Sequence, residues 1–267
     1  MGRGPDRSDA VARCKVGAQF HPQLTTMATL RRGWREADAM GVDSIWTWDH
    51  FFPLYDGPDG THFEGWSLLA AIACDTEHAE FGMLVACNSY RNPELLADIA
   101  RTVDHLSGGR LILGIGAGWF QRDYDEYGYT FGTAIERLRA LEAALPRIEA
   151  RLAALDPPPV RSPLPILIGG SGEKVTLRLV AEHANAWNSF GPPETYAAKN
   201  AVLDEWCERI GRDPAEIERT VLIDDDEVDQ TDAFLEAGAQ HLIVGLGTTG
   251  ETPFDLAPVQ RLLDLRG

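Results

Sequence analysis

The chain has 267 residues, of which 44% are hydrophobic, and its 41 acidic and 24 basic side chains give a formal net charge of -17 at pH 7. The length and hydrophobic content are typical of one large domain with a sizeable core. A chain this acidic repels nucleic acids and anionic membranes, so we expect it to bind neither.

Residues 1–14 are polar and lack the apolar stretch of a signal peptide, so we expect them to be disordered. The four cysteines form no CxxC pair and no zinc-like spacing, which is typical of reduced thiols in the cytoplasm. No apolar run approaches the roughly 18 residues that cross a bilayer. The sequence therefore predicts a cytoplasmic protein whose fold begins at residue 15.

Strand-like and helical segments alternate along the rest of the chain. The strand-like segments are residues 15–20, 43–50, 81–87, 110–118, 165–170, 185–190, 219–224 and 241–247. Several are continuous apolar runs, as expected of parallel strands that are buried on both faces. Segments with apolar residues three and four apart follow them, as in helices. The pattern predicts a single-domain (β/α)8 TIM barrel over residues 15–267, with an open doubly wound sheet as the alternative.

Two histidines follow predicted strands at the end of such a barrel where functional groups gather. Asp49 and His50 follow the second strand, and His21 follows the first. Histidine is the side chain best suited to proton transfer near neutral pH, so His50 is the candidate catalytic residue and His21 a weaker one. The structural alternative for His50 is a loop histidine that is hydrogen-bonded to its neighbours.

The fifth predicted strand ends in four small residues, directly before a helical pattern: Gly169, Gly170, Ser171 and Gly172. Free N–H groups and the helix dipole favour an anion at such a position, and glycine lets the backbone approach it closely. Lys174 falls in the predicted first turn of the helix, where a bound phosphate would offset its unfavourable position. The turn is therefore a candidate phosphate site, with a merely tight turn as the alternative.

The sequence gives no indication of a metal site or of a nucleophilic serine. A barrel metal hydrolase usually has two histidines close together on the first strand, and here that strand offers only His21. The acidic run at residues 224–226 has no histidine beside it, and no GxSxG motif occurs. We therefore expect no metal.

Four segments together resemble the bacterial luciferase-like family, and most closely its branch that uses the deazaflavin coenzyme F420. They are residues 49–51 (DHF), 88–119 (NSYRNPELLADIARTVDHLSGGRLILGIGAGW), 127–138 (YGYTF followed by ERL) and 165–188 (PILIGGSGEKVTLRLVAEHANAWN). The likeness extends over about residues 16–247. It implies a (β/α)8 barrel that holds a flavin-type ring at its C-terminal face, and a homodimer.

The resemblance also implies roles for particular residues. The turn of Gly169, Gly170, Ser171 and Gly172 would hold the phosphate of the coenzyme tail. A non-proline cis peptide would fall at Leu84–Val85, and Val85, Ala86 and Asn88 would line the ring. Asp49 would touch the deazaflavin, and His50 would donate or accept a proton.

These roles imply an F420-dependent oxidoreductase that transfers a hydride between the deazaflavin and a small organic substrate. One alternative is an FMN-dependent monooxygenase on the same barrel, and another is a barrel that binds the cofactor without catalysis. Trp119 stands where some sugar-phosphate dehydrogenases of the branch have a glutamate, and Leu54 where they have a tryptophan. Both differences argue against that particular activity.

Overall fold

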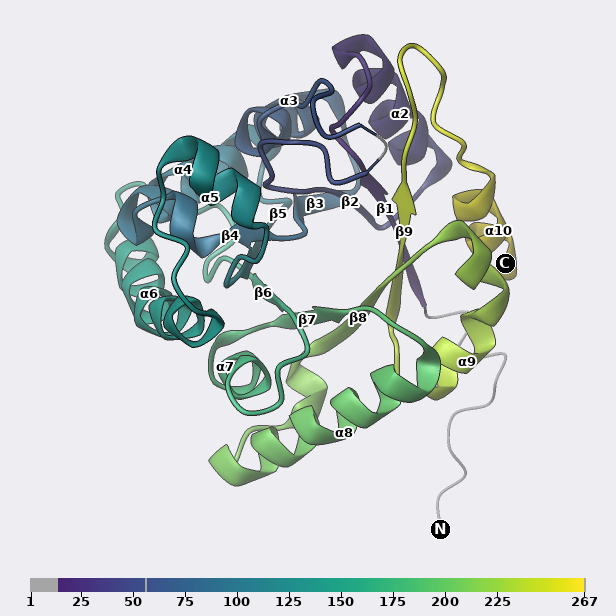
Figure 1. The fold of residues 1–267 in the computed structure, drawn as a ribbon. Helices are drawn as coiled ribbons and strands as arrows, with labels where there is room; N and C mark the ends of the chain where they lie inside the picture. Colours follow the sequence, from purple (N-terminus) through teal and green to yellow (C-terminus); the bar gives the residue numbers. More distant parts are fainter. Residues whose placement is uncertain (1–13, 56, 267) are drawn as a thin grey trace.

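The computed structural model describes residues 14–55 and 57–266, and it shows a ring of helices around a central barrel (Figure 1). Disorder is predicted for residues 1–14. Of these, residues 1–13 lie outside the described residues, and only Cys14 is described. Cys14 itself is buried and directly precedes the first strand.

The strands of the described chain form one parallel sheet that closes on itself. They are β1 (Lys15–Phe20), β2 (Ser44–Thr47), β3 (Glu80–Met83), β4 (Ala86–Cys87), β5 (Leu111–Gly116), β6 (Ile166–Gly169), β7 (Ala186–Ser189), β8 (Glu218–Ile223) and β9 (His241–Leu246). β1 pairs with both β2 and β9, and a pairing of β3 with β5 completes the ring. β3 and β4 are two parts of one barrel strand. The predicted eight-stranded closed barrel is therefore confirmed, and the open sheet was the wrong alternative.

Helices pack around this barrel in the expected alternation. They are α2 (Met27–Met40), α3 (Gly65–Asp75), α4 (Pro93–Ser107), α5 (Gln121–Tyr127), α6 (Ala134–Ala154), α7 (Thr176–His183), α8 (Pro193–Ile210), α9 (Thr231–Glu236) and α10 (Ala257–Arg266), with short 3-10 turns η1 (Asn88–Tyr90), η2 (Pro214–Glu216) and η3 (Asp225–Gln230). The Asn92 side chain caps α4 by accepting from the N–H groups of Glu94 and Leu95, and Pro93 is its first residue.

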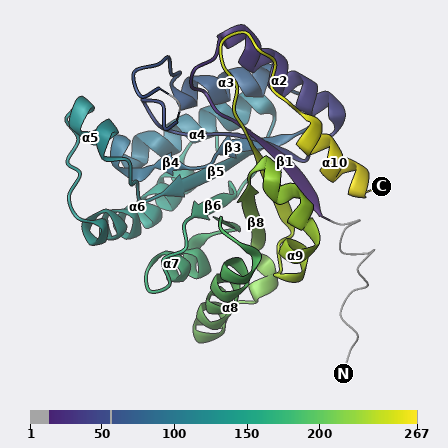
Figure 2. The same ribbon diagram turned by 45° about the vertical axis from the view of Figure 1, so that its right-hand side comes forward.

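Two helices differ from the prediction. The sequence did not predict α5, which precedes α6 and stands out from the ring of helices (Figure 2). α7 begins at Thr176 rather than directly after Gly172, because the Gly172 carbonyl accepts from Leu177 N–H and the chain completes a turn first. Lys174 therefore precedes α7 instead of lying in its first turn.

Apolar side chains fill the barrel interior. Six buried residues, five from different strands and one (Leu84) from between β3 and β4, form an inner cluster: Trp46, Leu84, Ile112, Leu167, Ala186 and Ile243. A larger core cluster contains apolar residues of both the strands and the helices around them. The barrel is thus a packed core rather than a channel, and ligands must bind at its ends.

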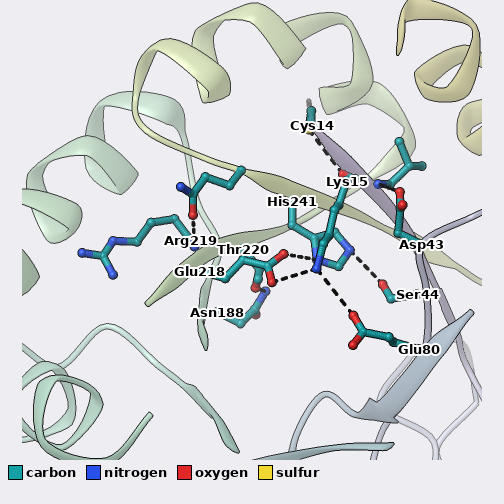
Figure 3. A network of polar contacts seen from close by, with 12 residues as sticks. Cys14, Lys15, Asp43, Ser44, Glu80, Asn188, Glu218, Arg219, Thr220 and His241 are labelled. Atoms are coloured by element: carbon teal, nitrogen blue, oxygen red, sulfur yellow. Dashed lines mark hydrogen bonds and ion pairs between the residues drawn. The ribbon is translucent and has the colours of Figure 1, made fainter. Parts of the chain in front are cut away.

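A polar network occupies the N-terminal end of the barrel (Figure 3). The Trp46 indole N–H donates to Ser44 Oγ at 2.6 Å, and Ser44 Oγ lies 2.8 Å from His241 Nε2. His241 Nδ1 donates to Glu218 Oε1 at 3.0 Å, and Lys15 Nζ donates to Glu218 Oε2 at 3.1 Å. The hydrogen bonds link strands β1, β2, β8 and β9, so this network stabilises the N-terminal end of the barrel.

The network makes stability depend on pH through Glu218. Burial disfavours the charge of Glu218, but His241 and Lys15 outweigh burial and lower its pKa from 4.5 to about 2. Because the folded-state pKa is the lower one, ionised Glu218 stabilises the fold above pH 4.5, and this contribution is lost as the pH falls through about 2. The shift corresponds to about 3 kcal/mol.

We therefore expect Glu218→Gln to lower the free energy of unfolding at pH 7 and to lose less further stability on acidification than the wild type. Urea unfolding at pH 7, 5, 4 and 3 measures both effects. Glu251→Gln, at an exposed loop position, is the control and should follow the wild type. Parallel pH curves for Glu218→Gln and the wild type would contradict the assignment.

Candidate active site

His50 is held by a carboxylate that the sequence did not reveal. Its Nδ1 lies 2.8 Å from Oδ2 of Asp123, a fully buried residue of α5. The Asp123 carboxylate also accepts from the Tyr90 hydroxyl at 2.8 Å and from Phe51 N–H at 3.1 Å. Since a carboxylate only accepts, Nδ1 carries the hydrogen, and Nε2 is left to exchange a proton with a ligand.

Aromatic rings surround His50. The Trp119 and Phe120 rings lie 5.5 and 5.3 Å from the imidazole, between ring centroids, and Trp48 lies at 6.0 Å. Trp119 is 63% exposed, so it forms the outer rim of the site. The rings exclude water from much of the space around His50, which strengthens electrostatic interactions there.

Asp49, the residue before His50, forms a buried ion pair with Arg91. Its carboxylate accepts from Arg91 at 2.6 and 2.9 Å and from Cys87 N–H at 2.9 Å. Burial raises the pKa of Asp49, and the paired Arg91 opposes that rise. Asp49 thus connects the end of β2 to β4 and to the segment that follows it.

The peptide bond between Leu84 and Val85 is cis, as the resemblance implied, and it separates β3 from β4. Gln19 Nε2, on β1, donates to the Leu84 carbonyl at 3.0 Å across the barrel interior. The Val85 side chain lies against β5 and β6, where a Cβ on Gly116 or Gly169 would be only 2.7 or 2.8 Å from a Val85 methyl group. We call Leu84 and Val85 the β3–β4 bulge.

Of the residues that accommodate the bulge, the sequence predicts only Gly169 as a site residue, and not Gln19, Gly114 or Gly116. Gln19 carries no local signal, because its partner is 65 positions away. The glycines were visible in the GIGAG stretch after Leu113, but there they fit a nucleotide motif only weakly. The structure explains Gly114 and Gly116 by their close approach to the bulge.

The three residues predicted to line the ring differ in burial, and their contact with the ring stays a prediction. Ala86 is fully buried in the larger core cluster, whereas Val85 is only partly buried. Asn88 is 8% exposed, and its side-chain oxygen is buried without a hydrogen-bond partner among the residues that the structure describes. A buried acceptor of this kind is costly unless a ligand donates to it. Val85 and Asn88 therefore fit a planar ligand with N–H or O–H donors.

The turn after β6 fits an anion. Gly170 has φ +123°, its N–H donates to the Asn188 carbonyl, and its carbonyl accepts from the Trp187 indole. Ser171, the next residue, makes no hydrogen bond to any other described residue through either its backbone or its side chain. The exposed Lys174 follows three residues later. The turn is thus fixed between β6 and β7 while the Ser171 N–H and hydroxyl remain able to donate to a ligand.

Residues 14–55 and 57–266 contain no group of three or more His, Cys, Asp or Glu side chains placed to hold a metal ion. No helix in the same residues is long and apolar enough to span a bilayer. The expected homodimer and cytoplasmic location stay predictions.

Known proteins share both the sequence pattern and the fold. A ketoreductase of phthiodiolone and phenolphthiodiolone dimycocerosates from Mycobacterium tuberculosis is 28% identical over 238 residues, which cover 76% of this chain and 62% of that protein. This chain thus spans less than two thirds of that relative. An F420-dependent glucose-6-phosphate dehydrogenase from Amycolatopsis mediterranei is 38% identical over 85 residues, or 31% of this chain and 25% of the relative.

Among solved structures, an F420-dependent secondary alcohol dehydrogenase in complex with an F420-acetone adduct superposes with a TM-score of 0.82. The alignment covers 96% of this chain and 99% of that one at 16% identity, so this likeness shows the fold. The family model for luciferase-like monooxygenases matches residues 11–227. The chain therefore belongs to the luciferase-like monooxygenase family.

Proposed function

We propose that the protein is an oxidoreductase that binds coenzyme F420 and transfers a hydride between its deazaflavin ring and a small organic substrate. The observation that carries this proposal is the arrangement at one barrel end of the β3–β4 bulge, the unpartnered Asn88 oxygen and the His50–Asp123 pair. F420-dependent enzymes among the relatives and the solved structures support it. The coenzyme, when bound, supplies the hydride chemistry.

The protein's own residues would bind and orient the coenzyme. Val85 supports one face of the ring, and the Asn88 oxygen accepts a hydrogen bond from its edge. The Ser171 backbone N–H and hydroxyl hold the phosphate of the tail, and Gly170, whose own N–H is paired with the Asn188 carbonyl, lets the backbone approach it closely. Asp49 supports the site indirectly: its carboxylate accepts a hydrogen bond from Cys87 N–H and so fixes the backbone next to Asn88.

His50 would move the proton that must accompany the hydride. When a carbonyl is reduced, its carbon gains a hydride and its oxygen gains a proton, which His50 Nε2 supplies; oxidation of an alcohol is the reverse. Asp123 keeps the imidazole in the required tautomer and stabilises the positive charge when His50 is protonated. Trp119 and Phe120 limit the access of water.

The choice of cofactor is testable by titration. We expect the purified protein to bind F420 more tightly than FMN, measured by fluorescence or calorimetry. A panel of ketones and secondary alcohols then tests turnover through the absorbance of F420. Tighter binding of FMN would favour the monooxygenase alternative, and cofactor binding without any turnover would favour the non-catalytic one.

The phosphate turn gives a prediction with a matched control. In Gly170→Asp we expect F420 affinity to fall about 10-fold or more, because a carboxylate would lie beside the phosphate of the coenzyme tail. Gly170→Asn has nearly the same shape and the same strain at φ +123° but no charge, so it should bind more tightly than Gly170→Asp. Titration of both variants with F420 measures the difference. Equal affinities would place the phosphate elsewhere.

A further inference from the structure

The His21 imidazole lies next to Trp48 in the site and has no hydrogen-bond partner among residues 14–55 and 57–266. His21 follows β1, and its backbone N–H donates to the Leu246 carbonyl at 3.0 Å. The ring stacks on Trp48 with 4.2 Å between centroids and an angle of 24°, and Tyr55 lies at 6.1 Å.

Small residues leave space next to both imidazole nitrogens. A Cβ on Gly245 would lie 3.5 Å from His21 Nε2, and a Cβ on Gly247 would lie 3.4 Å from His21 Nδ1. Glycine at these positions, at the end of β9 and just beyond it, therefore places no side chain of this segment against the edge of the ring; the Asp224 carboxylate also lies 3.5 Å from the Gly245 Cβ position. A polar ring that is stacked on one face and uncovered at its edge is placed to bind a ligand.

The surroundings of His21 also determine its charge. Burial lowers the pKa of His21 to about 4, so the imidazole is neutral at physiological pH. It then offers one N–H donor and one acceptor, and no positive charge. The aromatic rings of Trp48 and Tyr55 beside it favour an uncharged, partly apolar ligand over an anionic one.

We infer that His21 binds the substrate through a hydrogen bond from a neutral imidazole, and that the substrate is an uncharged alcohol or ketone. This inference rests on the proposed function for the presence of a redox substrate. It gives the two histidines different roles. His50, oriented by Asp123, exchanges a proton, whereas His21, without a carboxylate partner, orients the substrate through an oxygen atom.

Two variants separate the hydrogen bond from ring packing. His21→Phe keeps a flat ring for stacking on Trp48 but removes both nitrogens, whereas His21→Gln loses the ring and keeps a donor. One neutral hydrogen bond corresponds to a loss of about 5- to 10-fold in affinity. We expect this loss in His21→Phe, substantial recovery in His21→Gln, and F420 affinity close to the wild-type value in both.

Nuclear magnetic resonance of the imidazole nitrogens provides a readout that is independent of turnover. The wild type is titrated with a panel of uncharged alcohols and ketones of three to eight carbons, with and without F420, and the His21 signals are assigned by their absence in His21→Gln. We expect the signals of a neutral imidazole and a shift with at least one compound. Unchanged His21 signals with every compound, or equal affinity in His21→Phe and the wild type, would overturn the inference.

This design separates the two possible failures. If F420 does not bind, the proposed function fails, while the alcohols and ketones still test His21 in the unloaded protein. If F420 binds and the panel is turned over, a KM and kcat both unchanged in His21→Phe refute the role of His21 alone. A higher KM with nearly unchanged kcat supports it, because such a change reports binding that is common to the ground and transition states.

Discussion

Replacing His50 with alanine is expected to lower kcat about 100-fold or more while F420 affinity stays close to that of the wild type. The size follows from the usual contribution of a general acid or base. The affinity should persist because the residues proposed to hold the coenzyme, Val85, Asn88 and Ser171, do not include His50. Single-turnover rates and an F420 titration of the same preparation measure the two quantities separately.

Three further variants sharpen this experiment. His50→Gln can form hydrogen bonds but has no proton to exchange near neutral pH, so it should be as slow as His50→Ala. Asp123→Asn should also be slow, because an amide in place of the carboxylate can donate to Nδ1 and favour the wrong tautomer. His78→Ala, at an exposed position just before β3, is the control and should be unaffected. A His50→Ala enzyme with the wild-type rate would remove His50 from the mechanism.

The second large effect is expected from Gly114→Ala on β5. A Cβ at this position would lie 1.8 Å from the Met83 carbonyl oxygen, which is backbone and cannot rotate away. We expect the free energy of unfolding to fall by roughly 3 kcal/mol or more, at the upper end of the effect of overpacking. F420 affinity should fall as well, because Met83 directly precedes the β3–β4 bulge.

Urea unfolding and an F420 titration test this prediction, and Gly245→Ala on β9 is its control. A Cβ on Gly245 would have no described neighbour closer than 3.5 Å, which is ordinary van der Waals contact. Its stability should therefore change by no more than about 1 kcal/mol. If Gly114→Ala were as stable as Gly245→Ala, the close packing between β5 and the bulge would be refuted.

The fold was predictable because its signals are local and repeated. Each predicted strand overlaps an observed one, and several helix ends carry local markers, such as Asn92–Pro93 at the start of α4 and Gly41 after α2. α5 is followed by the C-cap Gly128 but has no capping side chain at its start: it has only seven residues, mostly polar, and its first-turn Asp123 is held by partners far away in sequence. Its position depends on tertiary contacts rather than on propensity.

The site was less predictable because most of its contacts join residues that are distant in sequence. His50 and the glycine turn could be found from residue type and position at strand ends. The residues that pair with His50 and Asp49 are distant in sequence: Asp123 lies 73 positions from His50, and Arg91 lies 42 positions from Asp49. The sequence alone could not show that the Asn88 oxygen has no partner, since that depends on which neighbours the barrel brings close.

The position of α5 has a consequence for how proteins built on this barrel could diversify. One member of the His50–Asp123 pair follows a barrel strand, and the other comes from a helix inserted in the connection between β5 and α6. Trp119, on the rim, belongs to the same connection. One exchangeable segment therefore carries both the residue that orients the proposed acid–base group and part of the rim of the proposed site. Reactivity and selectivity could thus be inherited or engineered together while the barrel strands are left intact.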